Sequence, residues 1–295
     1  MRYTRREFGR VAAGALALPA LGAGRLADSK IAGVRLGVQT YSFRELPRAD
    51  GSDQVDAVIA AMKQCGLSEC ELWAPQVEPR LGRTGREQLR SWRTATSLDH
   101  FRGVKKKFAA AGIDIYAYNY SFSADMTDAE IDRGFEMTRA LGANVITAST
   151  TLSTARRVAP FAERHQMAVA MHGHSNRSDP NEFCTPDSFA AAMQLSKYFK
   201  VNLDIGHFTA ADFDAVAYIR EHHANITNLH LKDRKKHEGD NLPWGQGETP
   251  IREVLLMLKK ERWPIPAYIE YEYRGTGTPT EEVQKCFQFA KQILA

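Results

Sequence analysis

Histidines and carboxylates gather at four places in the sequence, each near the end of a segment that favours a β-strand. They are His172 with His174, Asp204 with His207, His230 with Lys232 and Asp233, and Glu270 with Glu272. Imidazole and carboxylate ligands together suit Mn, Fe, Co or Zn better than Ca. One such residue alone is more often a turn cap or a buried polar side chain, but several at matching strand ends indicate a divalent-metal site.

The segment 200–233 shows how such residues can meet in space. Two apolar, β-rich runs at 201–206 and 226–231 flank one amphipathic helical stretch at 210–222. Two strands joined by a helical crossover run parallel. In a barrel of parallel strands, the carboxyl ends of the strands point into the mouth of the active site.

The same alternation of strand and helix continues through the chain. Strands are expected at 34–40, 67–73, 113–120, 144–150, 167–174, 201–206, 226–231 and 265–273. Helix starts are indicated by Thr185-Pro186 and by the capping box that begins at Thr278. Residues 74–97 lack hydrophobic periodicity and are expected to form a long functional loop.

This pattern predicts an α/β fold with a single (β/α)8 TIM barrel. The alternative is a doubly wound open sheet, which usually carries a glycine-rich phosphate loop after an early strand. No such loop is visible in the sequence. We therefore expect residues 28–295 to form one barrel domain.

The N-terminal residues 1–27 resemble a twin-arginine export signal. The pair Arg5 and Arg6 is followed by Phe8 and then by an apolar, small-residue stretch at 11–23. The alternatives are a basic chain start and a retained membrane anchor. An export signal implies a periplasmic or extracytoplasmic location and the twin-arginine translocation machinery as a partner.

Charge and composition exclude some classes of function. The 295 residues are 43% hydrophobic and 25% charged, which is ordinary for a globular domain. Residues 1–27 hold five arginines and one glutamate, so removing them from 39 basic and 35 acidic residues leaves 34 of each. A neutral mature chain lacks the basic surface of a nucleic-acid-binding protein. The four cysteines form no CxxC pair and are expected to be mostly free and buried.

Four motifs make the chain resemble a known superfamily over residues 34–295. They are LDIGH at 203–207, HLKD at 230–233, PWGQGE at 243–248 and YIEYE at 268–272. Together they resemble the xylose isomerase-like TIM barrel superfamily, in particular its sugar phosphate isomerase/epimerase group. The resemblance implies one divalent metal ion held by Glu, Asp, His and Glu from the fifth to eighth strands.

Three of these implied ligands match by position, namely Asp204, His230 and Glu270. The first glutamate is missing, and its place holds His172, so the fourth ligand is either His172 or Glu182 in the following loop. Epimerases of the group use two glutamates as acid and base on opposite faces of the substrate carbon. This departure favours chemistry with one essential carboxylate.

The remaining candidate residues receive roles from their chemistry. A divalent ion polarises a carbonyl, and Glu270 can then act as the base. His207 is a candidate to bind a substrate oxygen or to orient a ligand, and Lys232 is a candidate to stabilise an enediolate, although it equally suits a solvated surface. The candidates for substrate binding are His174, Glu182, Trp73 and Tyr118, with Tyr41 and Trp244 as further wall aromatics for which core packing is the alternative.

These residues predict a metal-dependent isomerase or epimerase that removes a proton next to the carbonyl of a small sugar. The alternatives are a lyase or hydrolase that cleaves oxidised (3-keto) glycosides and a non-catalytic sugar-binding barrel. The expected partner is a small sugar rather than nucleic acid, and a homo-oligomer is compatible with the sequence.

Overall fold

The computed structural model describes residues 28–81 and 85–295. The expected export signal at 1–27 lies outside the described residues. In chain order the elements are β1 (Lys30–Ile31), β2 (Val34–Gln39), η1 (Thr40–Phe43), α2 (Val55–Cys65), β3 (Glu69–Trp73), η2 (Ala74–Gln76), α3 (Arg86–Ala95), α4 (Leu98–Ala110), β4 (Asp114–Asn119), α5 (Asp128–Leu141), β5 (Val145–Ser149), α6 (Leu152–His165), β6 (Ala168–His172), α7 (Pro186–Met193), β7 (Phe199–Asp204), α8 (Ile205–Ala210), α9 (Ala215–His222), η3 (His223–Asn225), β8 (Ile226–Leu231), β9 (Asp233–Arg234), β10 (Asn241–Leu242), α10 (Ile251–Glu261), β11 (Ala267–Ile269) and α11 (Pro279–Leu294).

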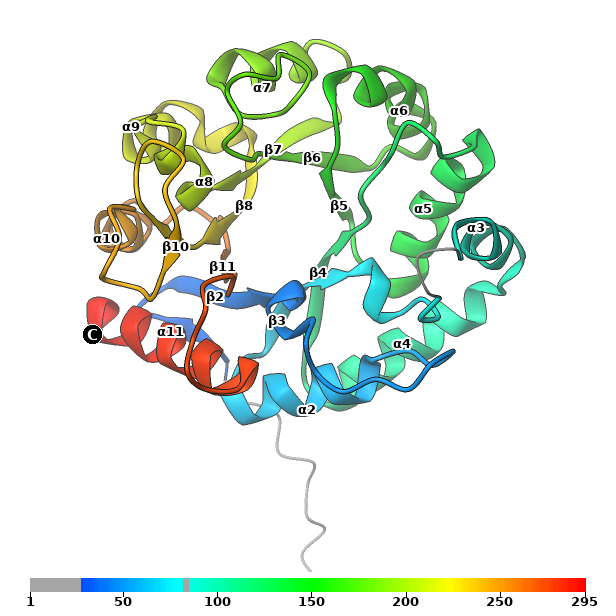
Figure 1. Cartoon of the computed structure of the whole chain (residues 1–295), viewed down its shortest axis with the longest axis horizontal. Coiled ribbons are helices and arrows are strands. Elements are labelled where there is room, and N and C mark those ends of the chain that lie inside the picture. The colour runs from blue at the N-terminus through cyan, green and yellow to red at the C-terminus, as the bar shows by residue number, and fades with distance from the viewer. Residues whose placement is uncertain (1–27, 82–84) are drawn as a thin grey trace, which may run out of the picture.

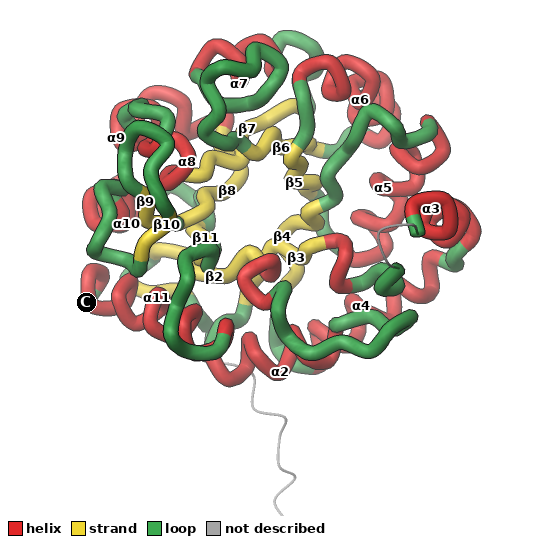
Figure 2. Tube along the Cα trace, viewed as in Figure 1, coloured by secondary structure: helices red, strands yellow, loops and turns green. Residues whose placement is uncertain are grey.

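Eight parallel strands close into a ring, which confirms the predicted (β/α)8 barrel. The order around the ring is β2, β11, β8, β7, β6, β5, β4 and β3, and β3 pairs back with β2. The helices surround this ring on its outside, as Figures 1 and 2 show. β1 extends the sheet by pairing antiparallel with β2. No helix among the described residues is long and apolar enough to cross a membrane.

An aromatic side chain fills the barrel interior below the site residues. Tyr268 lies two residues before Glu270 and therefore points to the same side of its strand. On the neighbouring strand Gly37 makes room for it, because a Cβ there would lie 2.6 Å from the Tyr268 ring. The hydroxyl of Tyr268 donates a hydrogen bond to Glu69 at 2.7 Å.

The last barrel strand is shorter than the predicted 265–273, because only Ala267–Ile269 pair as β11. Side chains from η1 and from the residue that follows it bond to the backbone beyond this strand. The Ser42 hydroxyl donates to the carbonyl of Ile269 at 3.2 Å and accepts from the amide of Tyr271 at 2.9 Å. Arg44 donates to the carbonyl of Tyr271 at 2.8 Å.

The helix expected at 210–222 begins later, since α9 spans Ala215–His222, and a separate short helix, α8, precedes it at Ile205–Ala210. Two aspartates explain the break. Asp204 caps α8 by accepting from the amide of His207 at 2.7 Å, and Asp214 caps α9 by accepting from the amide of Ala217 at 2.9 Å. A side-chain cap satisfies amides that have no partner within the helix, so each aspartate starts a helix.

Helix α3 contradicts the long loop expected over 74–97. Its arginines Arg86 and Arg90 bind the carboxylate of Glu130 on α5, whose side chain is fully buried. Ion pairs rather than an apolar stripe attach this helix to the barrel. Helix α3 therefore lacks the hydrophobic periodicity by which helices were recognised in the sequence, and its residues were predicted to form a loop.

Candidate metal centre

Four neighbouring strands bring one potential ligand each to the carboxyl end of the barrel. β6 ends on His172, β7 ends on Asp204, β8 carries His230, and Glu270 directly follows β11. Asp204 and His230 are register partners on adjacent parallel strands. One ligand atom from each of the four buried side chains lies within 4.8 Å of those of the other three. This spacing fits coordination of a single ion at about 2 Å per ligand bond.

The two imidazoles are oriented by hydrogen bonds on their far nitrogens. Nδ1 of His172 lies 2.8 Å from Oδ1 of Asn202, and Nε2 of His230 lies 2.8 Å from Oε2 of Glu71. Because these nitrogens donate to oxygen, the opposite ring nitrogens keep their lone pairs for a metal. Such outer hydrogen bonds are typical of metal-binding histidines.

Three of the converging atoms are buried polar atoms with no hydrogen-bond partner in the described part of the chain. They are Oδ2 of Asp204, Nδ1 of His230 and Oε2 of Glu270. Buried polar atoms are normally paired. Nδ1 of His230 and Oε2 of Glu270 lie 3.0 Å apart but are not aligned for a hydrogen bond, so these atoms are available to an ion. Two imidazoles and two carboxylates fit a divalent ion of the Mn, Fe, Co or Zn type.

Glu71 organises the layer beneath the four ligands, and the sequence had given it no role. Its fully buried carboxylate accepts hydrogen bonds from the side chains of Gln39 at 2.5 Å, Thr147 at 2.7 Å and Asn228 at 2.7 Å, in addition to the contact with His230. A carboxylate held by four partners fixes the orientation of His230. The only sequence signal was its position near the end of a predicted strand.

Lys232 is buried beside the ligands rather than solvated. Its ammonium lies 3.0 Å from Oδ2 of Asp204 and 3.1 Å from Oε2 of Glu270, in neither case aligned for a hydrogen bond, and 2.5 Å from Oε2 of Glu272. Gly206 makes room for the side chain, because a Cβ there would lie 2.7 Å from Cγ of Lys232. Burial alone would lower the pKa of this ammonium, but the carboxylates of Asp204, Glu270 and Glu272 outweigh it and hold the pKa above its usual value.

Burial and neighbouring charges shift the pKa values of the four ligands in different directions. Burial lowers the pKa of His172 well below its usual value, and the nearby His230 lowers it further. Burial raises the pKa of Glu270, but Lys232 and His230 outweigh it and hold that pKa well below the usual range. Burial raises the pKa of Asp204 despite Lys232. The carboxylates of Glu71 and Glu270 outweigh the burial of His230 and hold its pKa well above the usual value.

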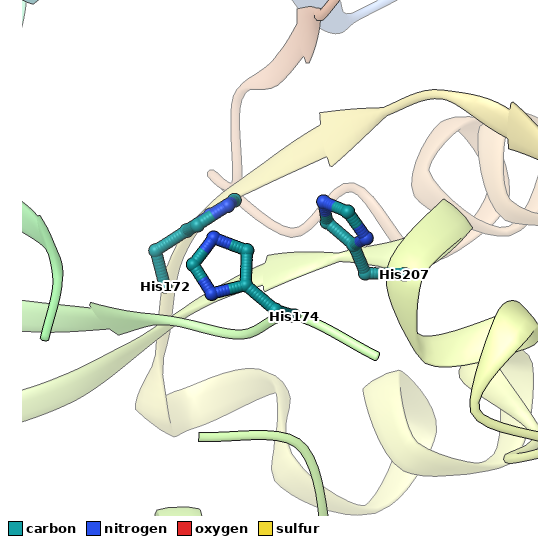
Figure 3. Close-up of side chains that lie close together, drawn as sticks. All are labelled: His172, His174 and His207. Carbon is teal, nitrogen blue, oxygen red and sulfur yellow. The ribbon is translucent and has the colours of Figure 1, made fainter. Parts of the chain in front are cut away.

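A cavity of about 310 Å³ opens onto these residues, which is at the small end of the range for ligand sites. Figure 3 shows His172, His174 and His207 gathered close together beside the strand ends. The residues that line the cavity are Gln39, Tyr41, Trp73, Asn119, Ser121, Ser149, His172, His174, His207, His230, Glu270 and Glu272.

The remaining predicted substrate-binding residues divide into two groups. Trp73 lines the cavity and packs edge-to-face with Tyr41, with 4.9 Å between the ring centroids. Glu182 does not line the cavity, but its Oε1 lies 3.0 Å from Nδ1 of His174, which does.

The structure places Tyr118 and Trp244 outside the cavity. Neighbouring residues alternate across a strand, and Asn119 faces the cavity, so Tyr118 points to the helix layer and stacks on Tyr120 with 5.8 Å between centroids. Trp244 packs edge-to-face against Phe289 of α11. Both aromatics therefore serve packing, which was the alternative for each. Asp233, also in the strand-end group, instead anchors the following loop by accepting from the amides at 245, 247 and 249.

Replacing His172 by alanine should lower affinity for Zn²⁺ or Co²⁺ by more than about 100-fold, since losing a ligand costs more than losing an outer hydrogen bond. Glu182→Ala should leave affinity within about threefold, because Glu182 contacts His174 and is not one of the four converging ligands. Competition titration with a chromogenic chelator measures both variants. A Glu182→Ala protein that loses the ion would show that the loop glutamate is the fourth ligand.

A closed barrel with a buried His/Asp/Glu group at the carboxyl ends of its strands defines a metal-site TIM barrel. The chain belongs to the family described as xylose isomerase-like TIM barrel, whose model matches residues 59–293.

Three similar proteins share 14 to 25% sequence identity with this chain. L-ribulose-5-phosphate 3-epimerase UlaE of Escherichia coli is 25% identical over 140 residues, which span 46% of this chain and 47% of that protein. The structure of D-psicose 3-epimerase with D-tagatose from Clostridium cellulolyticum superposes with a TM-score of 0.63 at 14% identity, over 88% of this chain and 99% of that one. The IOLI protein with a bound zinc atom gives a TM-score of 0.64 at 14% identity, over 88% and 97%. These likenesses establish the fold.

Proposed function

We propose that the protein is a divalent-metal-dependent isomerase or epimerase that removes a proton next to the carbonyl of a small sugar. The observation that carries the proposal is the set of four converging ligand atoms beside a cavity into which the Glu270 carboxylate faces. The partial match to a ketose-phosphate epimerase agrees with this class of reaction.

The residues present suit each part of such a reaction. A divalent ion held by His172, Asp204, His230 and Glu270 would polarise the substrate carbonyl and acidify the adjacent C–H bond. The anionic Glu270 takes the proton, and the electron pair of the C–H bond moves toward the carbonyl oxygen. Trp73 and Tyr41 offer an apolar wall for the sugar ring.

The cavity favours a sugar without a phosphate group. Among the described residues that line it, none is lysine or arginine, whereas phosphate recognition usually relies on such cations. Its small volume fits a monosaccharide better than an extended ligand. We therefore infer a free ketose or aldose as substrate, in contrast to the phosphorylated substrate named for the curated relatives.

A second candidate is a lyase or hydrolase acting on 3-keto glycosides. It is favoured by the imidazole of His172 in the fourth ligand position, which leaves Asp204 and Glu270 as the only carboxylates of the ligand group. The pair of His174 and Glu182 at the cavity suits protonation of a departing oxygen better than a second, symmetric deprotonation. With a single carboxylate base, removal of the proton can end in loss of a neighbouring group.

One experiment separates these functions. The Zn²⁺-, Mn²⁺- or Co²⁺-loaded protein is incubated in D2O with D-fructose, D-psicose or D-tagatose and followed by proton NMR, with a chelator-treated sample as control. An isomerase or epimerase incorporates deuterium beside the carbonyl and forms a new sugar. The proposal fails if no sugar exchanges. In that case, release of p-nitrophenol from its 3-keto glucoside indicates the lyase, and sugar binding without either reaction indicates a binding protein.

A further inference from the structure

The half of the barrel that does not carry the candidate metal ligands also borders the cavity. The ligands come from β6, β7, β8 and the end of β11, which are neighbours in the ring (Figure 1). The other four strands, β2 to β5, contribute the uncharged cavity residues Gln39, Trp73, Asn119 and Ser149. A sugar with its carbonyl at the metal ligands therefore meets uncharged side chains on its other side.

The contacts of Asn119 determine which end of its amide faces the neighbouring strand. Asn119 and Thr147 are register partners on β4 and β5. Nδ2 of Asn119 donates to Oγ1 of Thr147 at 3.1 Å and lies 3.4 Å from the carbonyl oxygen of the same residue. A backbone carbonyl can only accept a hydrogen bond, so the amide nitrogen and not the amide oxygen must face Thr147.

The buried carboxylate of Glu71 holds Thr147 in the orientation that this contact needs. The Thr147 hydroxyl donates to Oε1 of Glu71 at 2.7 Å, so its single hydrogen is used there and its oxygen accepts from Asn119. Both Thr147 and Glu71 are fully buried. Oδ1 of Asn119 is left on the side of the amide away from Thr147, and among the described residues none donates a hydrogen bond to it.

Gln39 is oriented by the same carboxylate. Its Nε2 donates to Oε1 of Glu71 at 2.5 Å, and its Oε1 accepts from the amide of Tyr41 at 3.0 Å. The second hydrogen on Nε2 has no partner in the described part of the chain. Glu71 thus fixes a free acceptor on Asn119, through Thr147, and a free donor on Gln39. Sugar hydroxyls both donate and accept, so they suit these two atoms.

We propose that Asn119 is a substrate-binding residue whose Oδ1 accepts a hydrogen bond from a sugar hydroxyl away from the reacting carbon, and that Thr147 and Glu71 are positioning residues that fix its amide in this orientation. The site then prefers a sugar with a free hydroxyl at that position over a deoxy or O-methylated one. The binding of a sugar hydroxyl rests on the proposed function. The orientation of the amide does not, because it follows from contacts within the protein.

Neutron diffraction from crystals of the deuterated full-length protein tests the orientation, since it locates deuterium atoms. We expect both side-chain deuterons of Asn119 on the atom that faces Thr147. Deuterons on the atom that faces away from Thr147 overturn the proposal, whatever the protein does with sugars.

Calorimetric titration of the Zn²⁺-loaded protein with D-fructose, D-psicose and D-tagatose tests the binding role. For a sugar that binds, Asn119→Ala and Thr147→Val should each weaken binding about 10-fold, as expected for one hydrogen bond. Thr147→Ser keeps the hydroxyl and should stay within about threefold of the unmodified protein. Zn²⁺ affinity should change less than about threefold in all three variants, because neither residue is a ligand. Equal losses of sugar and ion binding contradict the proposal.

Proton exchange separates this inference from the proposed function. The hydroxyl stays uncharged during the reaction, so Asn119→Ala should raise KM about 10-fold and leave kcat within about threefold. One monodeoxy analogue of the sugar should bind the unmodified protein and Asn119→Ala equally. If sugars exchange with an unchanged KM in Asn119→Ala, the inference fails and the proposed function stands. If no sugar binds or exchanges, the proposed function and the binding role fail together, whereas neutron diffraction still decides the orientation of the amide.

Discussion

Replacing Glu270 by glutamine is expected to lower proton exchange from the substrate by about 10³-fold or more, because general-base catalysis and one ligand oxygen are lost together. The amide keeps the shape of the side chain and its position after β11 but cannot accept a proton. Deuterium incorporation at saturating Co²⁺, normalised to the metal bound, measures the effect separately from weaker metal binding.

Glu272→Gln is the matched control for this substitution. Glu272 also binds Lys232 but does not belong to the ligand group, so its loss should reduce exchange less than about tenfold. A Glu270→Gln protein that keeps more than a tenth of the exchange rate would remove Glu270 as the base. Equal losses in both variants would instead point to the charge around Lys232 as the decisive feature.

Replacing Glu130 by glutamine should lower the free energy of unfolding by about 2 to 3 kcal/mol, the usual cost of breaking buried charge-assisted hydrogen bonds. Its carboxylate accepts from Arg86 at 2.7 Å, from Arg90 at 2.9 Å and from the amide of Thr127 at 3.0 Å. It also closes the capping box of α5. Urea denaturation at pH 7 measures the loss.

The same substitution should change the response to acid. Burial alone would raise the pKa of Glu130, but the hydrogen bonds from Arg86, Thr127 and Arg90 lower that pKa to about 2. The unfolded carboxyl titrates near pH 4.3. Because the folded pKa is the lower one, the stability that Glu130 contributes is complete above about pH 4.3 and is lost as the pH falls toward 2.

The difference in stability between the unmodified protein and Glu130→Gln should therefore shrink between about pH 4.3 and 2. Glu136→Gln on the same helix is the control, since Glu136 pairs with Arg133 near the surface and should contribute less than about 0.5 kcal/mol. A difference that stays constant down to pH 2.5 would show that the carboxylate is not held by the arginines.

The residues at the strand ends could be predicted because an apolar run followed by a polar residue is visible within a short stretch of sequence. Asp204, His230 and Glu270 each stand at such a place, and the structure brings them together with His172. The barrel itself follows from the repetition of the same pattern. Once the strands are identified, the residues that follow them can be predicted to lie together at the carboxyl end of the barrel.

Features that depend on contacts between distant segments could not be predicted from such local patterns. Glu71 binds Asn228 across 157 positions of sequence, and Arg234 approaches His207 only because of how the loop after β8 folds. The orientation of Tyr118 depends on strand register, since a shift of one residue exchanges the two faces of a strand. Helix α3 was not predicted because ion pairs hold it against the barrel, and charged residues follow no simple periodicity in the sequence.

Because β11 is short, the backbone around Glu270 depends on a contact from another part of the chain, and this affects how the site can evolve. Glu270 sits between Ile269 and Tyr271, and both neighbours are tied to the hydroxyl of Ser42, more than 200 positions earlier in the chain. A substitution at Ser42 would leave the strands paired yet move the backbone on either side of Glu270. Ser42 is thus a position at which inherited variation can adjust the reach of the Glu270 carboxylate without changing any residue that lines the cavity.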